Sequence, residues 1–214
     1  MNSSPATTAT KLTRQLPSAC VAAHTEQLPQ VELESLNQLG LALDVAVELH
    51  DTARRQAVHA ALAHFAAHAD LGLLLHKPAD STTGRQDSSP AAGYRRHLLL
   101  ADPGGRYSAV AIVWGKDQYS PVHGHHTWCA YSVLQGALCE SCFEWCEAEQ
   151  AARLNTAGRA IRRLPGEVSY TEAGHCGIHR LGNPHSEPAI SVHIYGVPGE
   201  HIATAVNDLV AVNA

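Results

Sequence analysis

The sequence has no long apolar run, and none of its apolar stretches approaches the roughly 20 residues that a membrane-spanning helix needs. It also lacks a basic field, because only three lysines accompany twelve dispersed arginines and the net charge is −5. We therefore expect neither a membrane span nor a nucleic-acid partner. The first ten residues contain no apolar segment of the signal-peptide type, so we expect a cytoplasmic location.

The length of 214 residues suits a single well-buried domain and is short for two. Changes in composition along the chain divide it into four parts. We expect a flexible arm over residues 1–26 and a helical segment with its following loop over 27–90. A β-barrel is expected over 91–200, and a C-terminal segment of uncertain type over 201–214.

Two helices are predicted before the barrel. Apolar residues recur at helical spacing between Leu28 and Leu49. We expect Asp51 or Thr52 to cap a second helix that runs towards Ala69. After the loop the apolar period changes, and many short strands follow with turn residues between them, interrupted by a polar loop over residues 147–159. This pattern favours a β-barrel or sandwich of the jelly-roll type.

Six cysteines are present, and three of them lie close together at residues 139, 142 and 146. If residues 138–145 form a strand, Cys139 and Cys142 point to opposite faces and cannot share a tetrahedral zinc ion. Buried or half-buried free thiols are the better interpretation, and a structural zinc site is the alternative.

A candidate metal site begins with His123 and His125, which alternate along a predicted strand and therefore share one face, while His126 points to the other. Alone, this pair also fits ordinary surface histidines. His179, within a Gly-Ile-His-Arg-Leu-Gly-Asn segment, supplies a third candidate ligand. Three neutral histidines suit iron and zinc equally well, so the ligands alone do not select the metal.

These segments resemble the two-part signature of the cupin superfamily. His123 and His125 are followed by Gly136 at the family's distance, and His179 is followed by an Asn at position 183. The spacer after Gly115 is two residues too long. Cys129 stands where most cupins carry a Glu ligand. Three histidines with Cys in place of Glu resemble the cysteine dioxygenases, in a bacterial form.

Two further groups of residues are similar to that family. Ser191, His193 and Tyr195 alternate along one predicted strand, a spacing that allows a hydroxyl–imidazole–phenol relay, although such a face is often only solvated. Tyr94 and Arg96 likewise share a face, and a guanidinium can hold a carboxylate through two parallel hydrogen bonds. A lone Arg is more often simply a surface charge.

The resemblance spans roughly residues 94–198 and implies a mainly β cupin, or jelly-roll, barrel with the N-terminal pair of helices packed on it. It implies Fe(II) held by the three histidines and L-cysteine as substrate, with Arg96 taking the carboxylate, assisted by Tyr94. Both atoms of O2 would pass to sulfur and give cysteine sulfinic acid. His193 would position the Tyr195 phenol, and Ser191 would orient His193.

The resemblance leaves several alternatives open. In mammalian-type members, a Cys and a Tyr at the places of Cys129 and Tyr195 join as a thioether; a free buried thiol is the alternative here. Gly124 replaces the usual Asp of the family. The surroundings of the His pair look closer to bacterial 3-mercaptopropionate dioxygenases, which makes that thiol the alternative substrate. A non-catalytic cupin that binds a metal or a small ligand is the alternative of another class.

Overall fold

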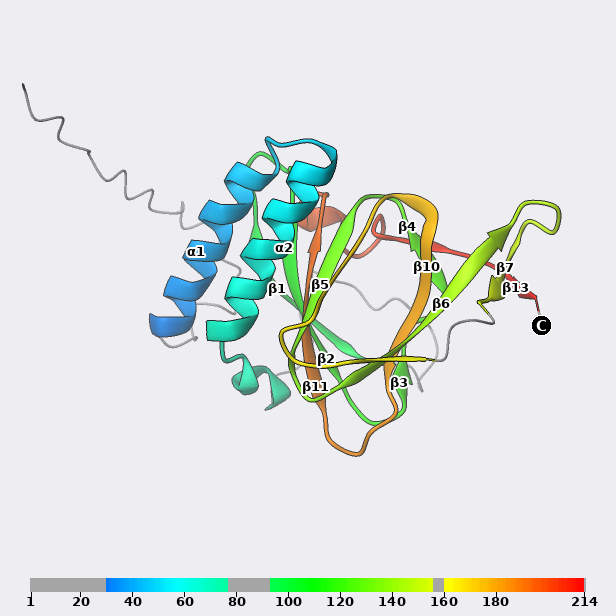
Figure 1. Ribbon diagram of the computed structural model, residues 1–214. Coiled ribbons are helices and arrows are strands. Elements are labelled where there is room, and N and C mark those ends of the chain that lie inside the picture. The colour runs from blue at the N-terminus through cyan, green and yellow to red at the C-terminus, as the bar shows by residue number, and fades with distance from the viewer. Residues whose placement is uncertain (1–29, 77–92, 156–159, 214) are drawn as a thin grey trace, which may run out of the picture.

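The structure is a computed structural model that describes residues 30–76, 93–155 and 160–213 (Figure 1). The arm expected over residues 1–26 and the loop over 77–90 lie outside the described residues. The described part comprises two α-helices, two short 3-10 helices and thirteen strands. The helices are α1 (Gln30–Ala46), α2 (Asp51–His68), η2 (Gly72–His76) and η4 (Gly199–His201). The strands are β1 (Arg95–Ala101), β2 (Ser108–Trp114), β3 (Gln118–Tyr119), β4 (His123–His125), β5 (Cys129–Gln135), β6 (Leu138–Cys146), β7 (Ala151–Leu154), β8 (Ile161–Arg163), β9 (Val168–Thr171), β10 (Gly174–Asn183), β11 (Ala189–Tyr195), β12 (Asn207–Leu209) and β13 (Val212–Asn213).

Both expected helices form, and each buries one apolar stripe. Leu36, Leu39 and Leu43 recur at helical spacing on α1 and are almost completely buried. The expected cap of α2 is wrong. The helix begins at Asp51, and its N-cap residue is His50, which makes no side-chain capping hydrogen bond.

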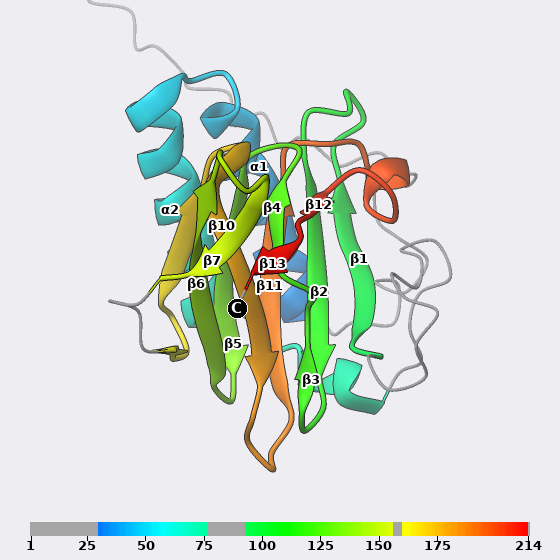
Figure 2. The same cartoon turned by 90° about the vertical axis from the view of Figure 1, so that its right-hand side faces the viewer.

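The strands form two sheets that face each other, as Figures 1 and 2 show from two sides. The first has the order β1-β2-β11-β5-β9. The second has the order β12-β4-β10-β6-β7-β13, with β3 beside β10 and β8 beside β6. The two sheets enclose one apolar interior, to which Ile112 and Tyr131 contribute from the first sheet and Leu138 and Leu181 from the second. The chain thus forms the mainly β barrel with two N-terminal helices that the sequence predicted.

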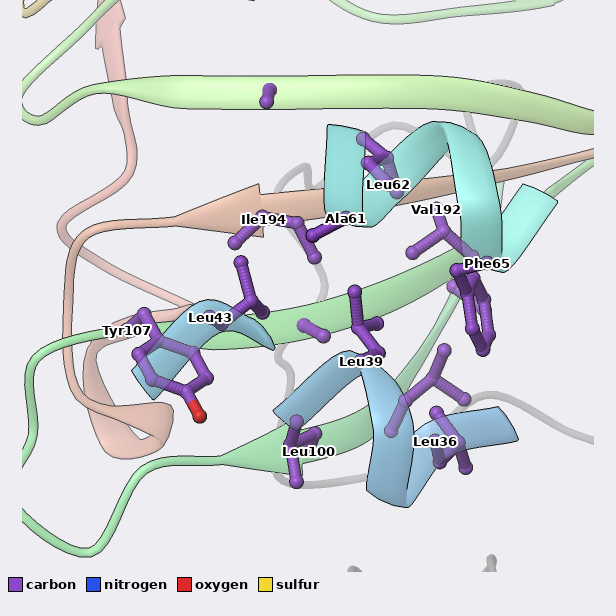
Figure 3. Close-up of a cluster of buried hydrophobic side chains, with 14 of the residues drawn as sticks. Leu36, Leu39, Leu43, Ala61, Leu62, Phe65, Leu100, Tyr107, Val192 and Ile194 are labelled. Atoms are coloured by element: carbon purple, nitrogen blue, oxygen red, sulfur yellow. The ribbon is translucent and has the colours of Figure 1, made fainter. Parts of the chain in front are cut away.

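Strands β2 and β11 are buried along their whole length, because both faces of the first sheet are covered. Alternate residues divide between the two faces. Val192 and Ile194 of β11 pack outward against Leu39, Leu43 and Leu62 of the helices, in the cluster drawn in Figure 3. The residues between them face the barrel interior.

Arg106 links helix α1 to the barrel through ion pairs. It lies between β1 and β2 and forms ion pairs with Asp44 of α1 and with Glu48 just after it. Its Nε also donates a hydrogen bond of 2.8 Å to Asp102. Arg106 holds the pKa of Asp102 below its usual value, against the opposing effect of burial.

Two segments differ from the sequence-based expectation. The polar loop expected over residues 147–159 contains strand β7, which pairs with β6 and with β13. The C-terminal segment, of uncertain type from sequence, supplies β12 and β13. Strand β12 lies directly beside β4, with Asn207 opposite His125 and Leu209 opposite His123. Neither helix of the described residues is long and apolar enough to cross a membrane.

Candidate metal centre

Three histidines converge in the barrel interior. His123 and His125 lie on β4, and His179 lies on β10 directly opposite His123. All three side chains are buried, and their candidate ligand atoms lie within 4.8 Å of one another. They are the one such group found among the described residues. His126, which follows the last residue of β4, is exposed.

The donor set fits a divalent metal ion. The Nδ1 of His123 is 2.9 Å from the carbonyl oxygen of Pro121, and the Nδ1 of His179 is 2.6 Å from Oε1 of Glu140. Both oxygens accept, so Nδ1 carries the proton in each ring and Nε2 keeps a free lone pair for a metal. Burial, and after it the nearby His179, lowers the pKa of His123 to about 3 and that of His125 to about 2. Both rings are therefore neutral at physiological pH, which is the form that binds metals.

Gly124, between the two ligands of β4, allows the strand to approach β10 closely. A Cβ atom added there would lie 2.7 Å from the carbonyl oxygen of Gly174, which is shorter than van der Waals contact. Gly174 itself adopts a φ of +89°, a conformation that glycine tolerates at no steric cost. Gly at position 124, where the family usually has Asp, therefore matches the close packing of β4 against Gly174 in this chain.

The inner face of β11 carries an ordered hydrogen-bond chain. Trp114 Nε1 donates to Ser191 Oγ at 2.8 Å, and Ser191 Oγ lies 2.9 Å from His193 Nε2. Because the Ser191 oxygen already accepts from Trp114, its hydroxyl hydrogen is free to point to His193. His193 Nδ1 then faces the Tyr195 hydroxyl at 3.4 Å. Burial lowers the pKa of His193 well below its usual value, so the ring is neutral.

Arg96 and Tyr94 line the same small cavity as the three histidines and Tyr195. Arg96 is 4% exposed, and its Nη2 donates to the Tyr94 hydroxyl at 3.2 Å. Tyr94 in turn packs against the Trp114 ring, with 4.6 Å between ring centroids. Arg95 points to the opposite face, where it donates a 2.6 Å hydrogen bond to the carbonyl oxygen of Leu75. The structure thus places one guanidinium of the Arg-Arg pair in the site and the other outside it.

Cys129 and Tyr195 are direct partners on the neighbouring antiparallel strands β5 and β11. Both side chains are buried and share a side-chain hydrogen bond. Burial raises the pKa of the Cys129 thiol and of the Tyr195 phenol. Both groups are therefore neutral and in contact beside the histidines.

The sequence-based interpretation missed Glu140, Arg163, Tyr131 and Asn207. Glu140 lies on β6 and is 3% exposed. It accepts hydrogen bonds from His179 and, at 2.7 Å, from Arg163 Nε of β8. These hydrogen bonds outweigh the opposing effect of burial and hold the pKa of Glu140 at about 2. The sequence did contain one indication of the role of Glu140, because a carboxylate that points into the interior from a strand needs a partner there.

Tyr131 and Asn207 complete the surroundings. The Tyr131 ring stacks on His193 at 5.2 Å between centroids and lies 6.2 Å from the His179 ring. Asn207, from β12, is buried and lines the small cavity with the histidines. The sequence carried no signal for Asn207, since nothing local indicates that residues 207–209 pair with β4.

Comparison with known protein families gives one match that covers more than half of the chain. Residues 85–205 match the family model described as cysteine dioxygenase type I. Cysteine dioxygenase type 1 of Rattus norvegicus is 32% identical over 108 residues, which are 49% of this chain and 52% of that protein. The Danio rerio protein of the same name is 30% identical over 114 residues, 52% of this chain and 56% of that protein. The chain spans about half the length of the curated relatives it matches.

Solved structures with a similar arrangement of strands are more distant. A cupin 2 conserved barrel domain protein from Salinispora arenicola has a TM-score of 0.39 at 19% identity, covering 60% of this chain and 94% of that one. A protein with a double-stranded β-helix domain from Klebsiella pneumoniae has a TM-score of 0.40, also at 19% identity. It covers 58% of this chain and 84% of that one.

Metal binding is expected to depend on His123, His125 and His179 and not on His126. Replacing any of the three buried histidines by Ala removes one ligand of the set, whereas His126 is exposed just beyond the end of β4 and is not part of that group. The measurement is the metal content of the purified single variants after loading with ferrous iron. If His126→Ala loses metal as completely as His125→Ala, the ligand set is wrong.

Proposed function

Because the chain belongs to the cysteine dioxygenase type I family, we propose that it is a non-haem Fe(II) thiol dioxygenase that oxidises L-cysteine to cysteine sulfinic acid. The observation that carries the choice of substrate is the buried Arg96 guanidinium, which shares one small cavity with the three histidines. Both oxygen atoms of O2 would be incorporated into the product.

Arg96 is suited to hold the carboxylate of an amino acid. A guanidinium presents two parallel N–H groups that match the two oxygens of a carboxylate, and burial strengthens that pairing. The Tyr94 hydroxyl accepts one hydrogen bond from Arg96, which fixes the orientation of the fork. A thiol whose carboxylate is held at Arg96 would place its sulfur towards the histidines.

His123, His125 and His179 would hold the Fe(II) ion, which when bound supplies the coordination and activation of the thiolate and of dioxygen. Ser191, His193 and Tyr195 orient one another and keep their hydrogens at defined atoms. Ser191 directs its hydroxyl hydrogen to His193, which leaves the opposite nitrogen of His193 to donate to the Tyr195 oxygen. Tyr195 therefore keeps its own hydrogen, which it shares with Cys129 and which its neutral phenol would donate to the substrate or to dioxygen once these are bound.

Oxygen uptake by the iron-loaded protein tests this function directly. L-cysteine, 3-mercaptopropionate and cysteamine should be compared at equal concentrations, with product identified by mass spectrometry. We expect uptake to be fastest with L-cysteine and to yield the sulfinic acid. Faster uptake with 3-mercaptopropionate would identify that thiol as the substrate. No uptake with any of the three would favour a non-catalytic cupin that binds a metal or a small ligand.

Arg96→Gln should lower kcat/KM for L-cysteine by roughly tenfold to a hundredfold, because a hydrogen bond to a charged group contributes about 1.5–3 kcal/mol. Arg95→Gln is the matched control, since Arg95 lies on the same strand and faces away from the cavity. The measurement is the steady-state kcat/KM for L-cysteine of both variants and of the parent protein. Equal losses in both, or unchanged turnover in Arg96→Gln, would remove the carboxylate role of Arg96.

A thioether between Cys129 and Tyr195 is expected after aerobic turnover, because the two side chains are in contact beside the metal ligands. The bond joins the sulfur to the ring carbon next to the phenol oxygen, and dioxygen takes up the two electrons and two protons that are released. Intact-protein mass spectrometry should show a species lighter by two hydrogen atoms, absent from Cys129→Ala and from Tyr195→Phe. A Cys129 thiol that stays fully alkylatable after many turnovers would contradict the crosslink.

A further inference from the structure

The three histidines differ in what supports the nitrogen that faces away from the site. His123 donates to the neutral carbonyl oxygen of Pro121 at 2.9 Å. The Nδ1 of His125 is buried and has no hydrogen-bond partner among the described residues. Of the three, only His179 donates to a carboxylate, Glu140, and at 2.6 Å this contact is shorter than that of His123.

The Glu140 carboxylate is itself held in place. Its Oε2 accepts a hydrogen bond from Arg163 Nε at 2.7 Å and forms an ion pair with Arg163 Nη2 at 2.6 Å, while Oε1 accepts from His179. The carboxylate therefore bridges a guanidinium and an imidazole, and both of its oxygens are engaged. The side chain of Glu140 is 4% exposed and that of Arg163 is 23% exposed, so the pair runs from the interior towards the surface.

A second cavity, of about 380 Å³, opens on this pair. Glu140, Arg163 and His179 all line it, together with Tyr131 and Cys129. His179 is the one residue that lines both this cavity and the smaller one that contains Arg96. A small molecule in the larger cavity can therefore reach the far side of the His179 ring without passing through the cavity that contains Arg96.

We propose that Glu140, fixed by Arg163, is a positioning residue that keeps Nε2 of His179 directed at the metal and makes His179 the strongest donor of the three ligands. A carboxylate that accepts from Nδ1 fixes the tautomer and orientation of the ring and raises the basicity of the opposite nitrogen. The proposal rests on the proposed metal centre and not on which thiol is the substrate.

The first test is metal affinity, measured by competition with a chelator, with Co(II) as a spectroscopic probe and Fe(II) under anaerobic conditions. Glu140→Ala should weaken binding by about 10- to 100-fold, the range for loss of such a partner. Glu140→Gln keeps the volume and should fold even if the Ala variant does not, yet it should also weaken binding and shift the Co(II) absorption bands. Glu144→Gln is the matched control, because Glu144 lies on the same strand and lines the same cavity but bonds to Asn155.

The cavity allows a second and sharper test. Glu140→Ala removes a CH2–COO⁻ group, and acetate, CH3–COO⁻, matches that group except for one additional hydrogen atom. Acetate should enter through the cavity, bind Arg163 and restore the acceptor for His179. Added acetate should therefore return the Co(II) affinity and spectrum of Glu140→Ala towards those of the parent protein, in a saturable manner. It should have no effect on the parent protein or on the double variant Glu140→Ala/Arg163→Ala.

The outcomes separate this inference from the proposed function. Weakened binding with rescue that requires Arg163 supports the positioning role. Parent-like affinity in both Glu140 variants overturns it, as does a loss that acetate does not restore or restores equally without Arg163. A parent protein that binds neither metal refutes the metal centre itself, whereas a parent that binds metal and oxidises no thiol refutes only the proposed activity.

Discussion

Burial of both faces of β2 and β11 is the constraint on which the rest of the structure depends. The helices cover the outer face, so its alternate residues must be small or aliphatic, as Ala111, Val192 and Ile194 are. The inner face is then sealed from bulk water on the side of the helices. Polar groups on that face must find partners within the barrel, because an unpaired buried polar group is costly. The chain from Trp114 through Ser191 to His193 meets that requirement.

The site that results has two chemically different sides. On one side Arg96 contributes a buried positive charge, and on the other Glu140 contributes a buried negative charge paired with Arg163. The three histidines lie between them. A cation bound by the histidines would add to the positive charge of Arg96, so the Arg96 side of the site favours an anionic ligand.

Much of the fold, and the shared face of His123 and His125, follows from the sequence, because both depend on local alternation. His123 and His125 share a face for the same reason that Ser191 and His193 do, and a period of two is visible in any strand. The helices were equally visible from the spacing of Leu36, Leu39 and Leu43. The family resemblance added the expectation of iron and the carboxylate role that we propose for Arg96, which alternation alone does not provide.

The features that were missed depend on which strands become neighbours. Glu140 meets His179 only because β6 and β10 pair in a register that places Cys142 opposite His179. Arg163 reaches Glu140 because the short strand β8 joins the other edge of β6. Strand β7 has only four residues, Ala-Ala-Arg-Leu, and alanine is not a residue type that favours strands, so its sequence gives little indication of a strand. Such pairings are properties of the assembled sheet and leave no trace in a local window.

The pairing of β12 with β4 has a consequence for the order in which the protein matures. Strand β4 has only three residues, and its neighbours are β10 on one side and β12 on the other, both far along the chain. Contacts between distant segments form late, because a long loop must close before they are made. During synthesis on the ribosome, the strand that bears His123 and His125 therefore stays without hydrogen-bonded neighbours until these later segments have emerged. A nascent chain would therefore complete its three-histidine site only after β10 and β12 have emerged.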